Sequence, residues 1–351
     1  QVSRPELELV DGGGGVFAVG IDVAASNSAV RDLAVHGFGT AGNAFTGNIR
    51  VAGATVTNVT LENNYVGIAA NAFADPGPNE RNGIILDAAD NLTIRNNLIG
   101  FADYAGIEVR GGVTGSLIEA NEIRGIGQAS TIYDGINVLN ASTLTIRGNL
   151  ITANLGPGID ATVSVSTITI ENNTITNNGT AGANERFGIE FQNPGAGNVV
   201  DRNVISGNQG AGVLVSTSTA GSNVNAGTVR ITRNSIFGNT GLGIDLDNSA
   251  ASPRAGDGFN AAVNDAGDLD AGPNNLTNAP TLTSATLGAN TTVNGTLLVP
   301  SGERARIEFF STANADPTGY GEGQTYLGFI DVTDGGAGDT GTWATNNGAG
   351  G

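Results

Sequence analysis

Apolar and polar positions follow a repeating order along most of the chain. An apolar residue, two variable positions, an asparagine, one further position and a second apolar residue recur every 24 to 33 residues between Leu61 and Leu246. The asparagines of this pattern are Asn64, Asn97, Asn121, Asn149, Asn173, Asn203 and Asn234. Each is followed by one glycine-apolar step, from Gly83-Ile84 to Gly243-Ile244. One repeat therefore predicts one structural turn, which must stack on its neighbours to bury its apolar side.

Within one repeat, the apolar residues alternate with polar ones over strand-length segments. Between Ser142 and Ser164, such segments lie at 144–146, 150–151 and 158–161. Three short strands per turn predict an all-β fold, a right-handed single-stranded parallel β-helix in which each strand pairs with its equivalents in neighbouring coils. Its interior column would stack about 4.8 Å apart. The column residues are Ile94, Ile118, Ile146, Ile170, Val200 and Ile231.

The asparagine and glycine columns have structural explanations. Asparagine tolerates the left-handed conformation of a sharp bend, and its amide can bond the asparagine of the next coil. Glycine permits positive φ and close approach of backbones. We therefore predict an asparagine ladder without a catalytic role. Three insertions, Asn71 to Arg81, Gly127 to Tyr133 and Asn178 to Arg186, should leave related corners, and insertions on one side of a solenoid often build its binding face.

The repeat ends after Leu246. We expect a β-helix over 1–250, an acidic cap or linker over 251–279, and a β-sandwich-like module over 280–351. Segments 280–287, 291–298, 305–310 and 326–332 alternate as antiparallel strands would. At the other end, the first coil should expose unpaired strand edges, so we expect either a cap within Pro5 to Val23 or end-to-end association.

Composition narrows the possible partners. The net charge is −18 and all 15 basic residues are arginine, so nucleic acid and anionic membrane surfaces are excluded as partners. The apolar stretches are strand-sized, which argues against membrane insertion. The chain has 0 cysteines and 1 histidine, so disulfides, a thiolate nucleophile and transition-metal sites are not expected. The acidity fits an extracellular or cell-surface location.

A polar line is the main candidate for chemistry. Glu108, Asn137, Asp160 and Glu190 fall on the outward position of four successive coils, and Asp245 follows two coils later. Adjacent members would lie about 5 Å apart and alternate members about 10 Å, which brackets the carboxylate separations of glycosidases.

Three readings of this line stay open: a solvated face, cation or glycan binding, and catalysis. The glycan-binding candidates are Tyr133, Asp134, Asn137 and Arg186. If the chain is an enzyme, its catalytic candidates are Glu108, Asp134, Asp160, Glu190 and Tyr133.

The acidic linker offers a candidate calcium site. Asp265, Asp268 and Asp270 alternate with small residues, as in a short loop that wraps carboxylates around calcium, although the EF-hand spacing is absent. The alternative is that these side chains form turns through local hydrogen bonds.

Several motifs resemble the parallel β-helix repeat modules of large bacterial secreted and surface proteins. They are Asn172-Asn173-Thr174-Ile175, Gly241-Leu242-Gly243-Ile244-Asp245-Leu246, Asn264-Asp265-Ala266-Gly267-Asp268, Arg306-Ile307-Glu308-Phe309-Phe310 and Gly319-Tyr320-Gly321-Glu322-Gly323-Gln324. The resemblance covers nearly the whole chain and implies location and architecture more than activity. The Asp-Pro-His-Asp motif of mannuronan epimerases is absent, as is the polygalacturonase pattern.

The sequence therefore favours a structural or adhesin-like module of a longer secreted or cell-surface protein, with polysaccharide, a cell-surface glycan or calcium as its expected ligands. The alternative is a polysaccharide-active hydrolase or lyase. The module would be a monomer or would associate end to end.

Overall fold

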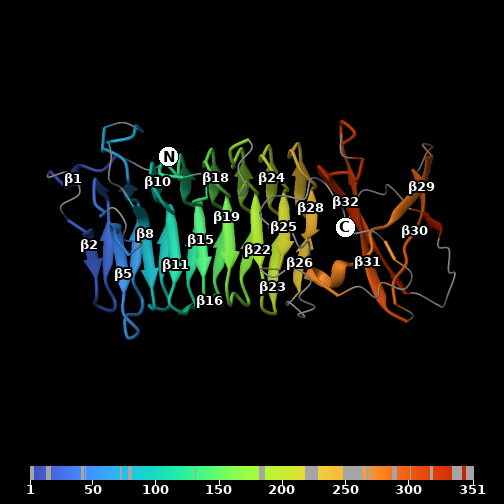
Figure 1. Ribbon diagram of the computed structural model, residues 1–351, viewed down its shortest axis with the longest axis horizontal. Coiled ribbons are helices and arrows are strands. Elements are labelled where there is room, and N and C mark those ends of the chain that lie inside the picture. Colours follow the sequence, from blue (N-terminus) through green and yellow to red (C-terminus); the bar gives the residue numbers. More distant parts are fainter. Residues whose placement is uncertain are drawn as a thin grey trace.

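The computed structural model describes residues 4–12, 17–40, 43, 45–71, 73–77, 81–130, 132–181, 186–217, 228–247, 264–265, 268, 271–286, 291–300, 302–316, 319–333 and 342–344. The strands wind into an elongated solenoid, with the antiparallel strands at its C-terminal end (Figure 1). The predicted parallel β-helix is confirmed.

Three parallel sheets form the walls of the solenoid, which confirms three strands per coil. Among the described residues, sheet A contains β1 (Leu7–Val10), β4 (Leu33–His36), β7 (Tyr65–Val66), β10 (Leu98–Gly100), β14 (Glu122–Arg124), β18 (Leu150–Thr152), β21 (Thr174–Thr176), β24 (Val204–Ser206) and β27 (Ser235–Phe237). Sheet B contains β2 (Val19–Val23), β5 (Gly47–Ala52), β8 (Asn82–Asp87), β11 (Ile107–Arg110), β15 (Ile136–Leu139), β19 (Ile159–Thr162), β22 (Ile189–Gln192), β25 (Val213–Ser216) and β28 (Ile244–Asp247). Sheet C contains β3 (Ala29–Arg31), β6 (Thr60–Glu62), β9 (Thr93–Arg95), β13 (Leu117–Glu119), β17 (Thr145–Arg147), β20 (Thr169–Glu171), β23 (Asn198–Asp201) and β26 (Val229–Thr232).

The remaining elements are short. Strands β12 (Val113–Thr114) and β16 (Ala141–Ser142) pair in parallel. After the solenoid come a 3-10 turn, η2 (Pro273–Leu276), and two small antiparallel sheets. One sheet holds β29 (Thr281–Thr286), β30 (Thr292–Thr296) and β33 (Thr342–Ala344), and the other holds β31 (Arg304–Ser311) and β32 (Thr325–Thr333). The antiparallel strands predicted for this region are thus confirmed.

The interior of the solenoid is one continuous apolar core. Ile118 pairs in register with Ile94 and Ile146, and all three side chains are fully buried. The core extends from Val23 in the first coil to Ile236 in the last. Because each buried isoleucine contributes about 1.5–3 kcal/mol, stacking the coils is the main source of stability.

The asparagine ladder is confirmed. The backbone N–H and the Nδ2 of Asn149 both donate to Oδ1 of Asn173 at 2.9 Å, and the same Nδ2 donates to the carbonyl of Ile118 at 3.0 Å. The left-handed residue, however, is not the ladder asparagine but the residue before it, as at Ala120 (φ 54°) and Arg202 (φ 55°). Because the preceding residue adopts the left-handed conformation of the bend, the side-chain amide of the asparagine is available to bond the next coil.

A second ladder lies five residues further along each of four coils. It consists of Asn154, Asn178, Asn208 and Asn239. Nδ2 of Asn178 donates to Oδ1 of Asn208 at 3.0 Å. We did not predict this ladder, although the spacing of five residues from the first one is visible in the sequence.

The glycine column is explained by close packing rather than by positive φ. A Cβ added to Gly158 would lie 2.6 Å from the carbonyl oxygen of Gly188 in the next coil, and Gly135 meets Gly158 at the same distance. Neither glycine has a positive φ. Larger residues here would push neighbouring coils apart.

The N-terminal region adds a coil. Within the described part of Pro5 to Val23, strands β1 and β2 pair in parallel with β4 and β5. These residues continue the solenoid and do not form a cap of different structure.

Candidate functional site

The three insertions leave the same corner of the solenoid. Each lies between a strand of sheet A and the next strand of sheet B: β7 and β8, β14 and β15, and β21 and β22. We call this edge the A/B corner. The prediction that the insertions leave related corners is confirmed.

An aromatic stack runs along the A/B corner, one residue from each of three successive coils. The guanidinium carbon of Arg81 lies 3.4 Å from the ring centroid of Tyr104, and the rings of Tyr104 and Tyr133 stack with centroids 3.8 Å apart. The N–H of Tyr104 donates to the carbonyl of Arg81 at 2.7 Å, so the backbone holds the first two residues in register. We call these three residues the corner stack. Such a cation–π and aromatic pair stabilises a rigid apolar surface with polar ends.

Burial raises the pKa of a tyrosine and of an aspartate at this corner. Burial, assisted by Tyr104, raises the pKa of Tyr133 to about 12. Burial also raises the pKa of Asp103, against the opposing charge of Arg81. Tyr133 is therefore a neutral hydroxyl at physiological pH and is not suited to act as a base.

The polar line exists on sheet B as predicted from the spacing. Glu108 pairs in register with Asn137, Asn137 with Asp160, and Asp160 with Glu190. The alternate residues of these strands point into the core, so the line faces outward from the sheet. It is nevertheless covered, because the exposed fractions are 7% for Glu108, 5% for Asp160 and 1% for Glu190. Leu214 then separates Glu190 from Asp245.

Glu108 has the best-defined surroundings in the line. Its Oε1 lies 3.4 Å from Nη1 of Arg110, and its Oε2 accepts a hydrogen bond from Nδ2 of Asn137 at 3.4 Å. Burial raises the pKa of Glu108 in spite of the Arg110 charge. Further along, the hydroxyl of Ser216 donates to Oε1 of Glu190 at 3.3 Å.

The predicted glycan-binding residues are only partly brought together. Tyr133, Asp134 and Asn137 lie on one coil at the start of β15. Arg186 lies two coils away, just before β22, because β19 pairs with β15 on one side and with β22 on the other. That separation is about 10 Å. The Cγ of Arg186 packs against Gly210 of the following coil.

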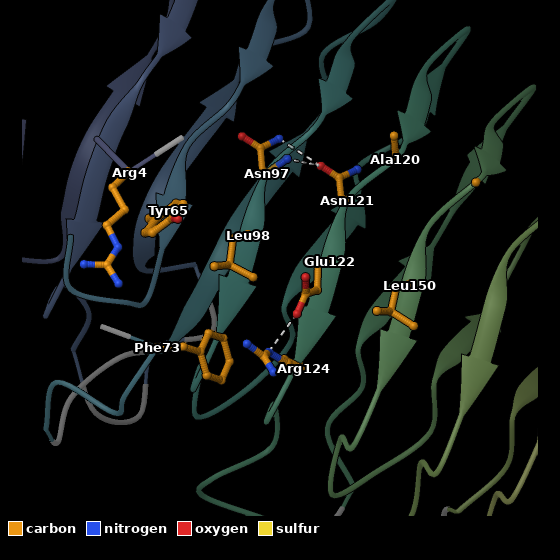
Figure 2. A pocket seen from close by; sticks show the side chains of 11 residues that line it. Arg4, Tyr65, Phe73, Asn97, Leu98, Ala120, Asn121, Glu122, Arg124 and Leu150 are labelled. Carbon is orange, nitrogen blue, oxygen red and sulfur yellow. Dashed lines mark hydrogen bonds and ion pairs between the residues drawn. The ribbon is translucent and has the colours of Figure 1, made fainter. Parts of the chain in front are cut away.

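A groove that we did not predict lies on the outer face of sheet A (Figure 2). Its volume is about 440 Å³. Its lining includes Arg4, Tyr65, Phe73, Leu98, Glu122, Arg124 and Leu150. Nε of Arg124 binds Oε1 of Glu122 at 2.9 Å, and its guanidinium lies 3.4 Å from the ring centroid of Phe73. Phe73 comes from the first insertion, so this insertion serves both the groove and the corner stack.

The outer face of sheet C carries acidic and basic side chains that pair with each other. Glu62 binds Arg31 and Arg95 at 3.1 and 2.9 Å, and Glu119 binds Arg147 at 2.8 Å. Such pairs leave little net charge for a ligand.

The acidic linker makes local hydrogen bonds. Oδ1 of Asp268 accepts the N–H of Asn278 at 2.8 Å, and the N–H of Asp265 donates to Oδ1 of Asn278 at 2.9 Å. Asp270 lies outside the described residues. Within the described ranges no group of three or more acidic, histidine or cysteine side chains could hold a metal, and no helix is long and apolar enough to cross a membrane.

The family of right-handed β-helix regions matches residues 45–229, and the chain belongs to this family. Two solved structures of PfbA, a surface adhesin of Streptococcus pneumoniae, are similar to it. One is 19% identical, with a TM-score of 0.49, over 64% of this chain and 62% of that chain. The other is 17% identical, with a TM-score of 0.47, over 65% and 60%. The chain thus spans about three fifths of the length of these structures.

An alginate lyase from Paenibacillus sp. str. FPU-7 is 16% identical, with a TM-score of 0.40, over 64% of this chain and 99% of that chain. These likenesses concern the fold alone, which adhesins and polysaccharide-active enzymes share. No curated protein sequence matches this chain.

Proposed function

We propose that this chain is an adhesin-like module of an extracellular or cell-surface protein, and that it binds neutral glycans at the A/B corner without turning them over. The corner stack is the observation that carries the proposal. Aromatic rings offer flat apolar faces to the C–H groups of a sugar, while nearby amides and carboxylates bond its hydroxyls. Asn137, on the same coil as Tyr133, is half-buried and supplies such an amide, whereas Asp134 is only 2% exposed and too buried to contact a sugar directly.

The charge of the chain selects the glycan class. A net charge of −18 repels uronates and sulfated sugars over long range. The arginine of the corner stack is already engaged with an aromatic ring, so it offers little to offset this repulsion. Neutral glycans carry no such cost.

Burial argues for binding over catalysis. A general acid and base must both approach the scissile bond within hydrogen-bond reach. Asp160 and Glu190 are 5% and 1% exposed, and Tyr133, with a pKa of about 12, stays protonated. The polar line is better suited to holding the wall of the corner in place than to contacting a reacting sugar.

One observation favours the alternative, a glycoside hydrolase. The raised pKa of Glu108 is what a general acid needs, and Asp160 lies two strands away. Their backbones are about 10 Å apart, near the upper end of the range used by inverting enzymes. In this alternative Glu108 would protonate the leaving group and Asp160 would activate water.

A neutral-glycan array, followed by titration of the best ligand, tests the proposal. We expect Tyr133→Ala to weaken binding about tenfold, since stacking of a ring on a ligand contributes on the order of 1–1.5 kcal/mol. Tyr320→Ala is the matched control, because Tyr320 is an exposed tyrosine in the C-terminal region. Equal affinities of the Tyr133→Ala variant and the wild-type chain would contradict the proposed site.

A further inference from the structure

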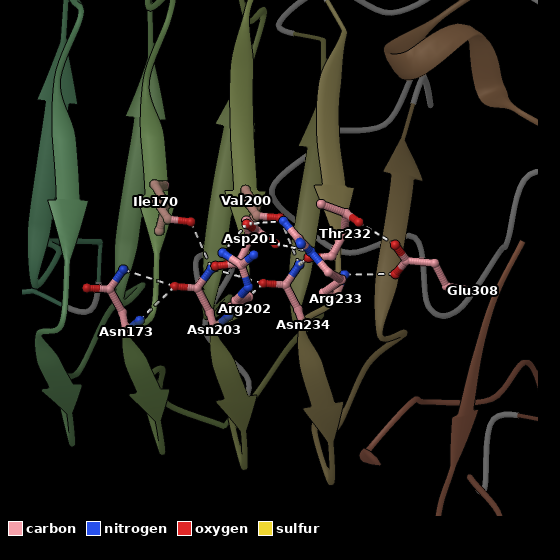
Figure 3. Close-up of polar contacts among 10 residues, drawn as sticks. All are labelled: Ile170, Asn173, Val200, Asp201, Arg202, Asn203, Thr232, Arg233, Asn234 and Glu308. Atoms are coloured by element: carbon pink, nitrogen blue, oxygen red, sulfur yellow. Dashed lines mark hydrogen bonds and ion pairs between the residues drawn. The ribbon is translucent and has the colours of Figure 1, made fainter. Parts of the chain in front are cut away.

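Every interior coil satisfies the backbone donors of the coil before it. The N–H of Asn172 donates to the carbonyl of Asp201, and the N–H of Arg202 donates to the carbonyl of Thr232, at 3.2 and 3.3 Å. Arg233 holds the same corner position in the last coil of the described solenoid. Its N–H donates instead to Oε2 of Glu308 at 2.7 Å, and the hydroxyl of Thr232 donates to the other carboxylate oxygen (Figure 3).

The second asparagine ladder ends in the same way. The N–H and Nδ2 of Asn208 donate to Oδ1 of Asn239 at 3.1 and 2.8 Å. The N–H and Nδ2 of Asn239 in turn donate to Oε1 of Glu322 at 3.2 and 2.9 Å. A carboxylate oxygen thus occupies the place of the next asparagine oxygen. Because a carboxylate only accepts hydrogen bonds, it ends the ladder without leaving a further donor to satisfy.

Two sheet edges are also occupied. On sheet A, the N–H of Ile236 donates to the carbonyl of Gly323 at 2.8 Å, and the hydroxyl of Ser235 donates to the carbonyl of Gln324 at 2.5 Å. On sheet C, the side-chain amide of Asn274 bonds both the N–H and the carbonyl of Val229, at 2.7 and 2.8 Å. This amide replaces the peptide group of a neighbouring strand.

We propose that Asn274, Glu308 and the 322–324 segment together act as a substitute coil, and that the edge they occupy otherwise accepts the first coil of a second copy of this chain. Glu308 and Glu322 belong to the two C-terminal motifs, 306–310 and 319–324, which are not part of the proposed glycan site. The two carboxylates lie 75 to 83 residues away from their partners in sequence.

The N-terminal end of the solenoid indicates why a second copy of this chain would fit the C-terminal edge. Strands β1, β2 and β3 begin the same three sheets that β27, β28 and β26 end, and among the described strands each has a partner on one side only. Parallel edges of this kind pair readily. Leu7 of β1 is 69% exposed, and Leu9 and Val10 are exposed beside it. Pairing of β1 with β27 of another copy would be a head-to-tail contact, which does not close and so grows into a filament.

The test uses the full chain carrying Glu308→Ala and Glu322→Ala together. We expect amide hydrogen exchange at Arg233 and Asn239 to become at least about tenfold faster, since their charge-assisted hydrogen bonds are lost. Exchange at Ile236 should follow, because its acceptor, the carbonyl of Gly323, adjoins Glu322 in the chain and loses that anchor. Exchange at Asn172 and Arg202 should stay unchanged, which separates loss of the cap from general unfolding. Light scattering should show a mass that rises with concentration. Glu303→Ala, an exposed glutamate of the same region, is the control.

A third substitution, Leu9→Lys, placed in the double variant should restore the monomer, because a charge on an edge strand blocks pairing. Unchanged exchange at the three amides would overturn the substitute coil. Faster exchange in a chain that stays monomeric at every concentration would overturn the second copy as the competing partner. Should the double variant fail to fold, Glu322→Ala alone is predicted to speed exchange at Asn239, and unchanged exchange there would be equally decisive.

Discussion

Replacing Asn173, a member of the asparagine ladder, by alanine should destabilise the chain more than replacing its exposed neighbour Asn172. In Asn173→Ala, the N–H of Asn149 loses its acceptor and the carbonyl of Ile146 loses the donor that Asn173 supplies, both at 2.9 Å. Nδ2 of Asn149 keeps the carbonyl of Arg147 at 3.0 Å. Two buried groups are thus left without these partners, and at about 1–3 kcal/mol each the cost is about 2–6 kcal/mol.

Urea unfolding of the two variants measures this cost, with circular dichroism and tryptophan fluorescence as independent probes. Asn172→Ala is the matched control, because Asn172 is exposed and only its backbone N–H is bonded to the next coil. It should cost about 1 kcal/mol, the lower end of the penalty for a left-handed alanine, because asparagine already bears part of that penalty. Similar losses in the two variants, or a loss below about 1 kcal/mol in Asn173→Ala, would refute the ladder as a source of stability.

Three further predictions concern a bend, a buried acid and calcium. Ala120 has φ 54°, so Ala120→Gly should raise the free energy of unfolding by about 0.5–1 kcal/mol; an unchanged urea midpoint would show an unstrained bend. The pKa of Glu108 is raised in the folded state, so its contribution favours folding below about pH 4.5 and is lost as the pH rises through the folded value. Glu108→Gln should therefore gain stability relative to the wild-type chain at pH 7 and lose that advantage at pH 4, as denaturation at the two pH values would reveal. Millimolar calcium should raise the melting temperature, and the rise should vanish in Asp268→Ala/Asp270→Ala. A rise that persists in this variant would place the ion elsewhere. No rise in the wild-type chain would contradict the calcium site and leave the hydrogen bond of Asp268 to Asn278 as its role.

The fold could be predicted because the repeat is local and strictly in register. Ile94, Ile118 and Ile146 fall at equivalent points of successive repeats, and stacking is the only arrangement that buries them. For the glycine column the sequence allowed both positive φ and close approach of backbones; that close approach alone applies at Gly158 depends on the distance between coils and not on the conformation of one residue.

The site was predicted less completely, since it depends on contacts between distant segments. The spacing placed Glu108, Asp160 and Glu190 in one line, but their burial depends on how the surrounding segments pack over sheet B. The pairing of Tyr104 with Arg81 joins two coils through side chains that follow no repeat. Glu322 meets Asn239 across 83 residues, and no periodic pattern signals such a contact.

The most direct test of glycan binding without turnover is to titrate the array-selected neutral glycan and then record its mass after prolonged incubation with the protein. Binding should be saturable and weakened about tenfold by Tyr133→Ala, and the glycan mass should be unchanged. Fragments that carry one added water, formed by the wild-type chain and not by Glu108→Gln, would contradict the account and establish the hydrolase instead.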